Sequence, residues 1–353
     1  MDLMKNFIGN RRAVNILKKA IEQDRLPHAM IFAGPSGVGK CTLAVLTAQA
    51  LNCLAPQNGN ACGQCNACRR IMAYVESRHK ECDKGEGAAC GVCSVCQQRN
   101  RRHPDIRLIE PEKKTTISID QVRDVIAETA FQPLEALYRV VIFDPADQMR
   151  AEAQNSLLKT LEEPPSRTVI ILIATNPYLL IETIRSRARI LPFGEIPQGQ
   201  IARYLEQNEG KSEPDALLAA AISGGSLGAA VEFNTVEYRN VRESALEFVG
   251  LLLNRGSFSH VSAIAANVTK DKGVFQTWME AVSALLRDIY YSSVAVGRVG
   301  QRDLIEKLQV MRQKTRHSHL VRVIEAMRKL QTDLHYNVNR QIAIEALFID
   351  LSK

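Results

Sequence analysis

The spacing of apolar residues divides the chain into a part in which strands and helices alternate and a later part that is helical throughout. Up to about residue 192, short runs made mainly of apolar residues alternate with amphipathic stretches. Runs without polar alternation predict strands buried on both faces of a parallel sheet. The predicted strands are Met30–Ala33, Arg107–Glu110, Val140–Phe143, Val169–Ala174 and Arg189–Leu191.

Helices are predicted where apolar groups recur every three or four residues. In the first part these stretches are residues 11–25, Thr42–Leu51, a helix that Ser118 or Asp120 begins, and Ala151–Leu161, which ends before Pro164. Residues 195–235 predict two helices around Gly224 and Gly225. The remaining residues predict a helical bundle made of Val241–Leu253, Val274–Ser292, Leu304–Arg316, His319–Leu334 and Asn339–Leu351.

The composition is that of an ordinary globular protein, with 46% hydrophobic and 24% charged residues. The sequence has neither a run of 18 apolar residues nor an N-terminal secretory pattern, so we expect a cytoplasmic protein. A net charge of +7 permits contact with nucleic acid without arguing for it. In a reducing compartment, nine cysteines predict metal ligands or reactive thiols rather than disulfides.

A phosphate-binding loop is predicted at residues 34–41, which read GPSGVGKC between a strand and a helix. Gly34, Gly37 and Gly39 would let the backbone N–H groups surround a phosphate, and Lys40 would reach the outer phosphates. The alternative is a glycine-rich turn without a ligand. The spacing and the context favour a nucleotide site.

Two chemical parts of that site are changed. Cys41 and not Ser or Thr follows the lysine, and a thiol is a poor ligand for Mg²⁺; Thr42 is one residue too far along. The apolar strand ends in Asp144, but Pro145 stands where a water-activating Glu is expected, and Asp147 has the wrong offset. Binding of ATP or ADP remains open, whereas we do not expect the chain to hydrolyse nucleotide by itself.

Two cysteine clusters interrupt the α/β pattern within residues 52–103. The N-terminal cluster has the spacing C-x8-C-x2-C-x2-C, and the later one, C-x7-C-x2-C-x2-C, resembles a duplication of it. Four thiolates predict a closed, structural zinc site. Two zinc ions are favoured, with one ion as the alternative if one set has drifted. The clusters are Cys53, Cys62, Cys65 and Cys68, and Cys82, Cys90, Cys93 and Cys96.

Polar residues beside the clusters admit two interpretations. His79 and His103 could replace a cysteine as a metal ligand, but we interpret them as bystanders. The flanking arginines either extend into solvent or contact DNA phosphates, and without interleaved aromatic residues the sequence does not decide. These arginines are Arg69, Arg70, Arg99, Arg101 and Arg102.

Three longer motifs together resemble the ATPase domains of bacterial DNA clamp-loader subunits. They are Leu26-Pro27-His28-Ala29, the sequence NSLLKTLEEPP at residues 155–165, and TIRSR at residues 183–187. The resemblance implies an AAA+ P-loop domain at residues 1–193 with the zinc insertion at 52–103. It also implies a small helical lid at 194–240 and an all-α collar at 241–353 for oligomerisation.

Within this family, three positions resemble the delta-prime (stator) type and not the gamma/tau (motor) type. They are Cys41, Pro145, and Gly228, which stands where motor subunits carry an arginine. The resemblance implies a component of the DNA polymerase III holoenzyme that joins gamma/tau and delta subunits in a hetero-oligomer. That assembly would load the sliding clamp onto primed DNA with energy from ATP.

The resemblance also implies roles for two residues at the carboxyl ends of strands and helices. Arg187 resembles the arginine finger that stabilises charge at a neighbouring subunit's γ-phosphate, and Ala188 replaces the usual Cys after it. A solvated basic edge with Arg185 and Arg189 is the alternative. Asn176 resembles a nucleotide sensor, with a capping role before Pro177 as the alternative.

Two other functions are kept open. An active gamma/tau-type ATPase would turn over ATP rapidly and lose that activity when Lys40 is replaced by Ala. A zinc-dependent nucleic-acid-binding regulator would bind DNA tightly, with strong salt dependence, through residues 52–103 alone.

Overall fold

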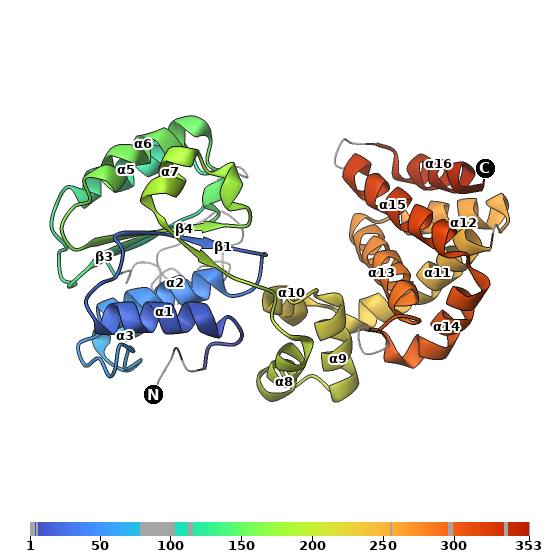
Figure 1. Ribbon diagram of the computed structural model, residues 1–353, viewed down its shortest axis with the longest axis horizontal. Helices are drawn as coiled ribbons and strands as arrows, with labels where there is room; N and C mark the ends of the chain where they lie inside the picture. Colours follow the sequence, from blue (N-terminus) through green and yellow to red (C-terminus); the bar gives the residue numbers. More distant parts are fainter. Residues whose placement is uncertain are drawn as a thin grey trace, which may run out of the picture. The chain divides into compact units, whose positions relative to one another are not determined.

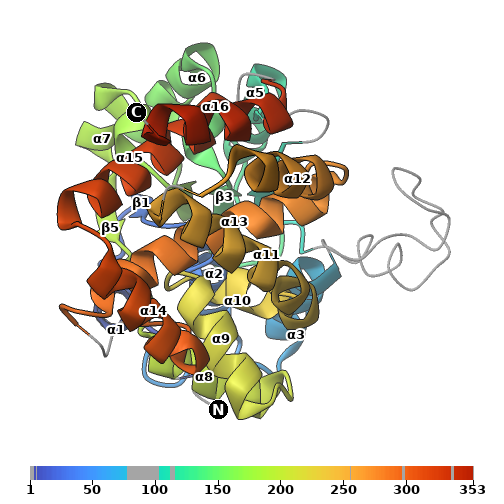
Figure 2. The ribbon, with the colours of Figure 1, turned by 90° about the vertical axis from the view of Figure 1, so that its right-hand side faces the viewer.

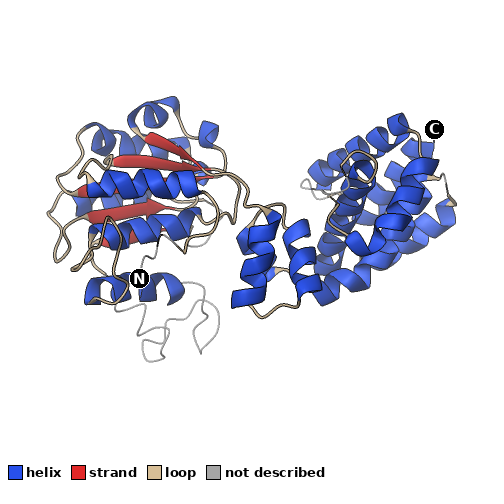
Figure 3. Cartoon of the chain, turned by 60° about the horizontal axis from the view of Figure 1, so that its bottom comes forward, coloured by secondary structure: helices blue, strands red, loops and turns tan. Residues whose placement is uncertain are grey.

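The chain consists of two compact units in the computed structural model, which describes residues 4, 6–77, 103–111, 116–254, 256–295, 299–334 and 338–352. The first unit is Met1–Pro197 with Ser226–Gly228, and the second is Gln198–Gly225 with Ala229–Lys353. In the part that the structure describes, the first unit contains the strands and the second is helical (Figure 3). This confirms the α/β domain followed by a helical region; the separate lid and collar remain a prediction.

The first unit is built on a five-stranded parallel sheet with strand order β2-β3-β4-β1-β5. All five strands lie where the apolar runs predict them, within one or two residues. The strands are β1 (Ala29–Ala33), β2 (Ile106–Ile109), β3 (Arg139–Phe143), β4 (Thr168–Ala174) and β5 (Arg189–Pro192).

Side chains of the central strands pack alternately into two hydrophobic layers. In β4, Val169, Ile171 and Ile173 belong to one layer, while Ile170 and Leu172 belong to the other. Because both faces of the sheet are covered, every position of this strand is buried. This is the physical reason why the run is apolar without alternation.

Helices cover both faces of the sheet (Figure 1). One face carries α1 (Arg11–Glu22), α2 (Lys40–Leu51) and α3 (Asn66–Ser77), and the other carries α5 (Ile119–Thr129), α6 (Ala151–Glu162) and α7 (Glu182–Arg187). Ser118 begins α5 with a reciprocal capping box, as predicted for this position. The short α7 and the cysteine-flanked α3 were not among the predicted helices.

Where the structure describes it, the second unit consists of helices (Figure 2). Its core includes Trp278, whose ring centroid lies 4.9 Å from that of Phe248. Residues 195–235 form three helices, not the predicted two, and α12 was not predicted. In the described residues, no helix is both long and apolar enough to cross a membrane. The helices are α8 (Gln198–Asn208), α9 (Glu213–Ile222), α10 (Leu227–Glu232), α11 (Thr235–Leu253), α12 (Phe258–Val268), α13 (Lys272–Tyr291), α14 (Ile305–Lys314), α15 (His317–Asp333) and α16 (Arg340–Ser352).

Candidate nucleotide site and metal centre

The predicted nucleotide-site residues come together at the carboxyl edge of the sheet. Strand β4 lies between β1 and β3, so the segments after these three strands are neighbours. Gly34, directly after β1, donates its N–H to the carbonyl oxygen of Ala174 at the end of β4, at 3.1 Å. Asp144 and Asn176 follow β3 and β4 at the same edge. Ligands of open parallel sheets bind at this edge.

The ammonium of Lys40 is directed back onto its own loop. Its Nζ donates to the carbonyl oxygens of Gly34 at 2.7 Å and Pro35 at 2.5 Å, and the residue is buried. Burial lowers the pKa of Lys40, while the carboxylates of Asp144 and Asp147 act in the opposite direction. The cation that would meet the outer phosphates therefore serves as an internal hydrogen-bond donor.

Other residues of the first unit lie closely against the glycines of the loop. Gly228 donates its N–H to the carbonyl oxygen of Gly37 at 3.0 Å. A Cβ added to Gly37 would lie 2.0 Å from the hydroxyl of Ser226, and one added to Gly39 would lie 2.8 Å from the ring of Phe7. The position at which motor subunits are expected to carry an arginine thus contacts the phosphate loop through its backbone.

Asp147 and Asn176 have structural partners. The carboxylate of Asp147 accepts the N–H groups of Thr175 at 2.7 Å and Asn176 at 2.9 Å, which fixes the end of β4. The side-chain oxygen of Asn176 caps the short 3-10 helix η2 (Pro177–Leu179) by accepting the N–H of Tyr178 at 3.0 Å. Asn176 thus has the capping role that was the alternative interpretation of this residue. Its role as a nucleotide sensor stays a prediction.

At the eighth position of the loop, Cys41 is half-buried and Thr42 is exposed. Both lie in the first turn of α2, which begins at Lys40. The thiol of Cys41 thus occupies the place in the first turn of α2 where the motif predicts a magnesium-binding hydroxyl.

Arg187 lies at the last position of α7 and remains 36% exposed. Its Nη2 forms an ion pair with Glu162, the last residue of α6, at 2.7 Å. Its Nη1 donates to the carbonyl oxygen of Thr183 at 3.0 Å and to the hydroxyl of Ser186 at 3.2 Å. The sequence motifs contain both Arg187 and Glu162, but nothing in the sequence pairs them.

The structure brings together the four cysteines of the first cluster. The Sγ atoms of Cys53, Cys62, Cys65 and Cys68 all lie within 4.8 Å of one another. The second cluster, Cys82, Cys90, Cys93 and Cys96, lies outside the described residues, as do His79, Arg99, Arg101 and Arg102. Four converging thiols are the donor set of a closed tetrahedral zinc site, so the described residues fit a metal ion.

Backbone N–H groups are directed at the sulfur atoms. Cys62 donates its N–H to the sulfur of Cys53 at 3.1 Å, and Cys65 donates to that of Cys62 at 3.3 Å. The N–H groups of Gln64 and Cys65 lower the pKa of Cys62 to about 6. Burial raises the pKa of Cys68 and of Cys53. Because metals bind the thiolate, N–H···S bonds favour the form that a metal requires.

The C-terminal end of α2 holds the first cysteine cluster in place. We call the segment with Cys53, Cys62, Cys65 and Cys68 the cysteine module. The side-chain amide of Asn52 exchanges two hydrogen bonds with the backbone of Tyr138, at 3.0 Å and 2.9 Å. One turn earlier, Gln49 donates to the carbonyl oxygen of Cys68 at 2.8 Å. The module is thereby joined both to α2 and to the segment that enters β3.

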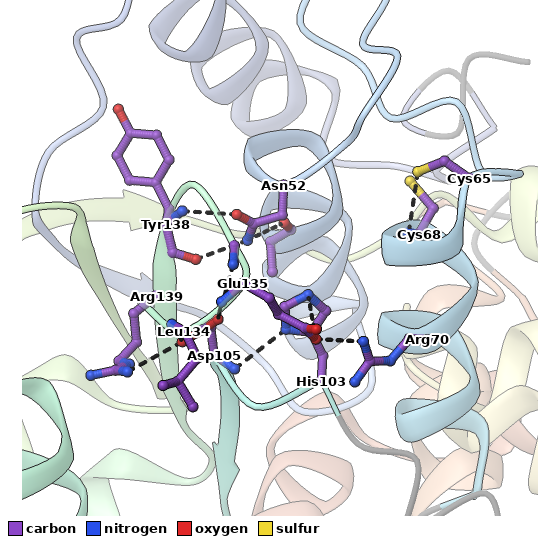
Figure 4. A network of polar contacts seen from close by, with 12 residues as sticks. Asn52, Cys65, Cys68, Arg70, His103, Asp105, Leu134, Glu135, Tyr138 and Arg139 are labelled. Carbon is purple, nitrogen blue, oxygen red and sulfur yellow. Dashed lines mark hydrogen bonds and ion pairs between the residues drawn. The ribbon is translucent and has the colours of Figure 1, made fainter. Parts of the chain in front are cut away.

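A polar network around the buried carboxylate of Asp105 connects to the loop that leads into β3 (Figure 4). The buried carboxylate of Asp105 forms an ion pair with Arg139 at 3.2 Å. It also accepts three backbone N–H groups, from Leu134 at 2.8 Å, Glu135 at 3.0 Å and Ala136 at 3.0 Å. These bonds fix the loop before β3.

The cysteine module is connected to this network through Arg70 of α3, which forms an ion pair with Glu135. The imidazole of His103 is buried, accepts the N–H of Asp105 at 3.3 Å and has a pKa lowered by burial. His103 thus has a structural role, consistent with its interpretation as a bystander to the metal site. The sequence signal for the network is the His103-Pro104-Asp105 triplet, whose function the pattern alone does not reveal.

The fold and the site define a clamp-loader-type subunit. They combine a five-stranded parallel P-loop domain of the AAA+ type with a cysteine-rich insertion after α2 and a helical region after the sheet. The family profile described as "DNA polymerase III, delta subunit" matches residues 9–81 and 72–197. The chain belongs to this family.

Full-length relatives indicate the subunit type. The chain is 27% identical to the DNA polymerase III subunit delta' of Bacillus subtilis strain 168 over 97% of this chain and 96% of that protein. It is 28% identical to the delta' subunit of Pseudomonas aeruginosa over 91% and 90% of the two chains. The tau subunit of Bacillus subtilis is 29% identical over 63% of this chain and 35% of its own length. The chain is thus a delta'-type subunit of the DNA polymerase III clamp loader, related to gamma/tau, as its three altered positions predict.

Proposed function

We propose that this chain does not hydrolyse ATP itself and instead supplies Arg187 to the ATP of a neighbouring motor subunit. It associates with gamma/tau-type and delta subunits in the cytoplasm, through a collar formed by residues 241–353. The assembly opens the sliding clamp and places it on primed DNA. Residues 194–240 form the lid of the P-loop domain.

The observation that carries this proposal is the contrast between two cations of the first unit. The ammonium of Lys40 is buried and bonded to the carbonyl oxygens of its own loop, whereas the guanidinium of Arg187 is 36% exposed at the end of a helix. A guanidinium that reaches a neighbour's γ-phosphate stabilises the charge of the transition state. An ammonium that is already occupied offers little to a nucleotide in its own loop.

The phosphate-loop residues retain the backbone of a nucleotide site without its catalytic parts. ATP or ADP would be held by the N–H groups of Gly37, Gly39 and Lys40 once the ammonium leaves the carbonyl oxygens. Cys41 offers no hard oxygen ligand to Mg²⁺, and Pro145 offers no base, so a bound nucleotide would be kept and not cleaved.

We infer that zinc occupies the first cysteine cluster and that a further ion occupies the cluster of Cys82, Cys90, Cys93 and Cys96. For the first cluster, the convergence of four thiols and the N–H···S bonds support this inference. Zinc bound by four thiolates has no open position, so its contribution is structural. It would fix the beginning of α3 against the end of α2.

The test is a clamp loader reconstituted with full-length chain, in which Arg187 is replaced by Ala. We expect ATP turnover at the adjacent motor site to fall by about 10³-fold, because the loss of an arginine finger has this magnitude. Replacement of Arg185 by Ala is the matched control, because its Nε is bonded to the carbonyl oxygen of Leu180 and its guanidinium lies 5.2 Å from the ring of Tyr178. Equal turnover by the Arg187→Ala variant and the native chain would exclude the arginine-finger role.

The isolated chain distinguishes this proposal from the motor-type alternative. We expect no ATP turnover above background from the purified full-length protein. Rapid turnover that Lys40→Ala abolishes would identify the chain as an active motor subunit.

A further inference from the structure

We infer that Glu162 is a positioning residue for Arg187: it holds the guanidinium in the orientation in which it meets a neighbouring subunit's phosphate. This inference rests on the proposed arginine-finger function and names the group in this chain that prepares the finger. It concerns the ion pair between the last residue of α6 and the last residue of α7, whose atoms lie 2.7 Å apart.

Three contacts define the orientation of the guanidinium. Nη1 donates hydrogen bonds to the carbonyl oxygen of Thr183 and the hydroxyl of Ser186, and Nη2 forms an ion pair with the carboxylate of Glu162. Thr183 and Ser186 belong to α7 itself, so they restrict the side chain only relative to its own helix. Glu162 is the contact that fixes it relative to α6 and therefore relative to the sheet on which α6 packs.

These contacts leave a donor for a phosphate. A guanidinium has five N–H donors in one plane. The two hydrogen bonds of Arg187 use Nη1, and the ion pair with Glu162 involves Nη2. The Nε–H is not used by these contacts and is available to a phosphate. Because an arginine side chain has high rotamer entropy, a partner that fixes it before the phosphate arrives lowers the entropy lost in the transition state.

Helix stability does not explain a glutamate at this position. Position 162 is the last residue of α6, where an acidic side chain faces the negative end of the helix dipole, so its charge is locally unfavourable. Glu162 and Arg187 are 50% and 36% exposed, and an exposed ion pair adds little to folding stability. The pair is better explained by the orientation that it gives to Arg187 than by the stability of the fold.

The adjacent residue provides a matched control. Glu163 is the C-cap of α6, has the same charge and is also exposed. A replacement by Gln at either position removes one negative charge from the same helix end. A difference between the two variants therefore reports the contact with Arg187 and not the general electrostatics of the helix.

The experiment measures ATP turnover by a clamp loader reconstituted with full-length variants of this chain. We expect Glu162→Gln to reduce the Arg187-dependent part of kcat about fivefold, with the KM for ATP unchanged, because a misdirected catalytic group reduces the rate and not the binding of ATP. Glu163→Gln should match the native chain. Glu162→Asp, which retains the carboxylate, should recover part of the loss, and the melting temperatures of the variants should agree.

The double variant decides whether Glu162 acts through Arg187. In the presence of Arg187→Ala, Glu162→Gln should cause no further loss, because the group that it positions is absent. A further loss in that background would overturn the inference, and so would a kcat for Glu162→Gln that equals or exceeds the native value. If Arg187→Ala itself leaves turnover unchanged, the proposed function fails; if only Glu162→Gln leaves it unchanged, the positioning inference alone fails.

Discussion

The two ends of helix α2 carry different kinds of candidate site: a phosphate loop at the N-terminal end and a four-cysteine cluster at the C-terminal end. At its N-terminal end, the phosphate loop has its lysine bonded to the loop's own carbonyl oxygens and Gly37 in contact with Ser226 and Gly228. At its C-terminal end, four cysteine sulfur atoms converge within 4.8 Å, with N–H groups directed at them. At the first end, Cys41 and Pro145 stand where a magnesium-binding hydroxyl and a base are expected, whereas the second end brings together four thiols that could hold a metal ion.

Under the proposed function, this difference has a physical reason. A structural metal contributes to the shape of the domain whenever the protein is folded, so all of its ligands are needed. If neighbouring subunits supply the catalysis, the phosphate loop needs only the backbone that joins the sheet to α2. Each of the following substitutions tests one side of this contrast.

The largest effect is expected from Cys65→Ala, which removes one thiolate from the cluster. We expect the zinc content to fall by about one ion per chain and the module to lose its order, because the binding free energy of a structural zinc is of order 10 kcal/mol in small modules. Metal analysis and hydrogen exchange at the start of α3 provide the measurements. Cys41→Ala, at the other end of α2, should leave the zinc content unchanged; an equal loss from both variants would contradict the assignment.

A smaller effect is expected from Asp105→Asn, next to the cysteine module. The amide cannot accept all the bonds that the carboxylate accepts and leaves Arg139 buried without its counter-charge, so we expect a loss of about 3 kcal/mol of unfolding free energy. Denaturant unfolding of the full chain measures this loss. Glu128→Gln, which affects an exposed ion pair with Arg107, is the control and should cost under about 1 kcal/mol.

The same carboxylate gives a pH dependence with a defined sign. Burial alone would raise the pKa of Asp105, but the N–H groups of Glu135, Leu134 and Ala136 together with Arg139 more than offset it, so the pKa lies below its usual value of 3.8. The stabilisation is therefore complete well above pH 3.8 and is lost as the pH falls through the lowered pKa. The difference in unfolding free energy between the native chain and Asp105→Asn should shrink in acid; a constant difference would contradict this account.

At the phosphate loop, Gly37→Ala tests how closely the loop is covered. The residue has a φ of 70°, and the new Cβ would lie 2.0 Å from the hydroxyl of Ser226, so we expect a loss of about 1–3 kcal/mol in unfolding free energy. Adding Ser226→Ala should recover part of that loss. Gly194→Ala, where a Cβ would meet nothing within 4 Å, should be close to neutral. A neutral Gly37→Ala would show that the loop is open.

The smallest effect is expected from Lys40→Ala. Because the ammonium is bonded to its own loop and Pro145 stands where a base is expected, we expect the ATP turnover of a reconstituted loader to remain within about twofold of the native rate. For Arg187→Ala, the same measurement should show the large fall in ATP turnover expected from the loss of an arginine finger. If Lys40→Ala stopped turnover, the contrast between the two ends of α2 would be wrong.

Much of the first unit could be predicted from the sequence because its signals are local. An apolar run buried on both faces has few alternatives to a central parallel strand, and all five strands were located in this way. The first four cysteines could be grouped because C-x2-C spacing places two thiols within reach of one metal. The helices α3, α7 and α12 were missed. Helix α3 was missed because Ile71 packs against the core from within a polar, cysteine-rich segment.

The sequence by itself determined the order of strands and helices, the altered phosphate loop, the cysteine donor set and the likeness to clamp-loader subunits, because each depends on residues close together along the chain. Only the tertiary structure decided which residues far apart in the sequence contact one another. Arg187 pairs with Glu162, Asp105 with Arg139, and Gly228 lies on Gly37, across separations of 25, 34 and 191 residues. Such contacts depend on how the sheet orders its strands and where the helices end, and neither is encoded in local spacing.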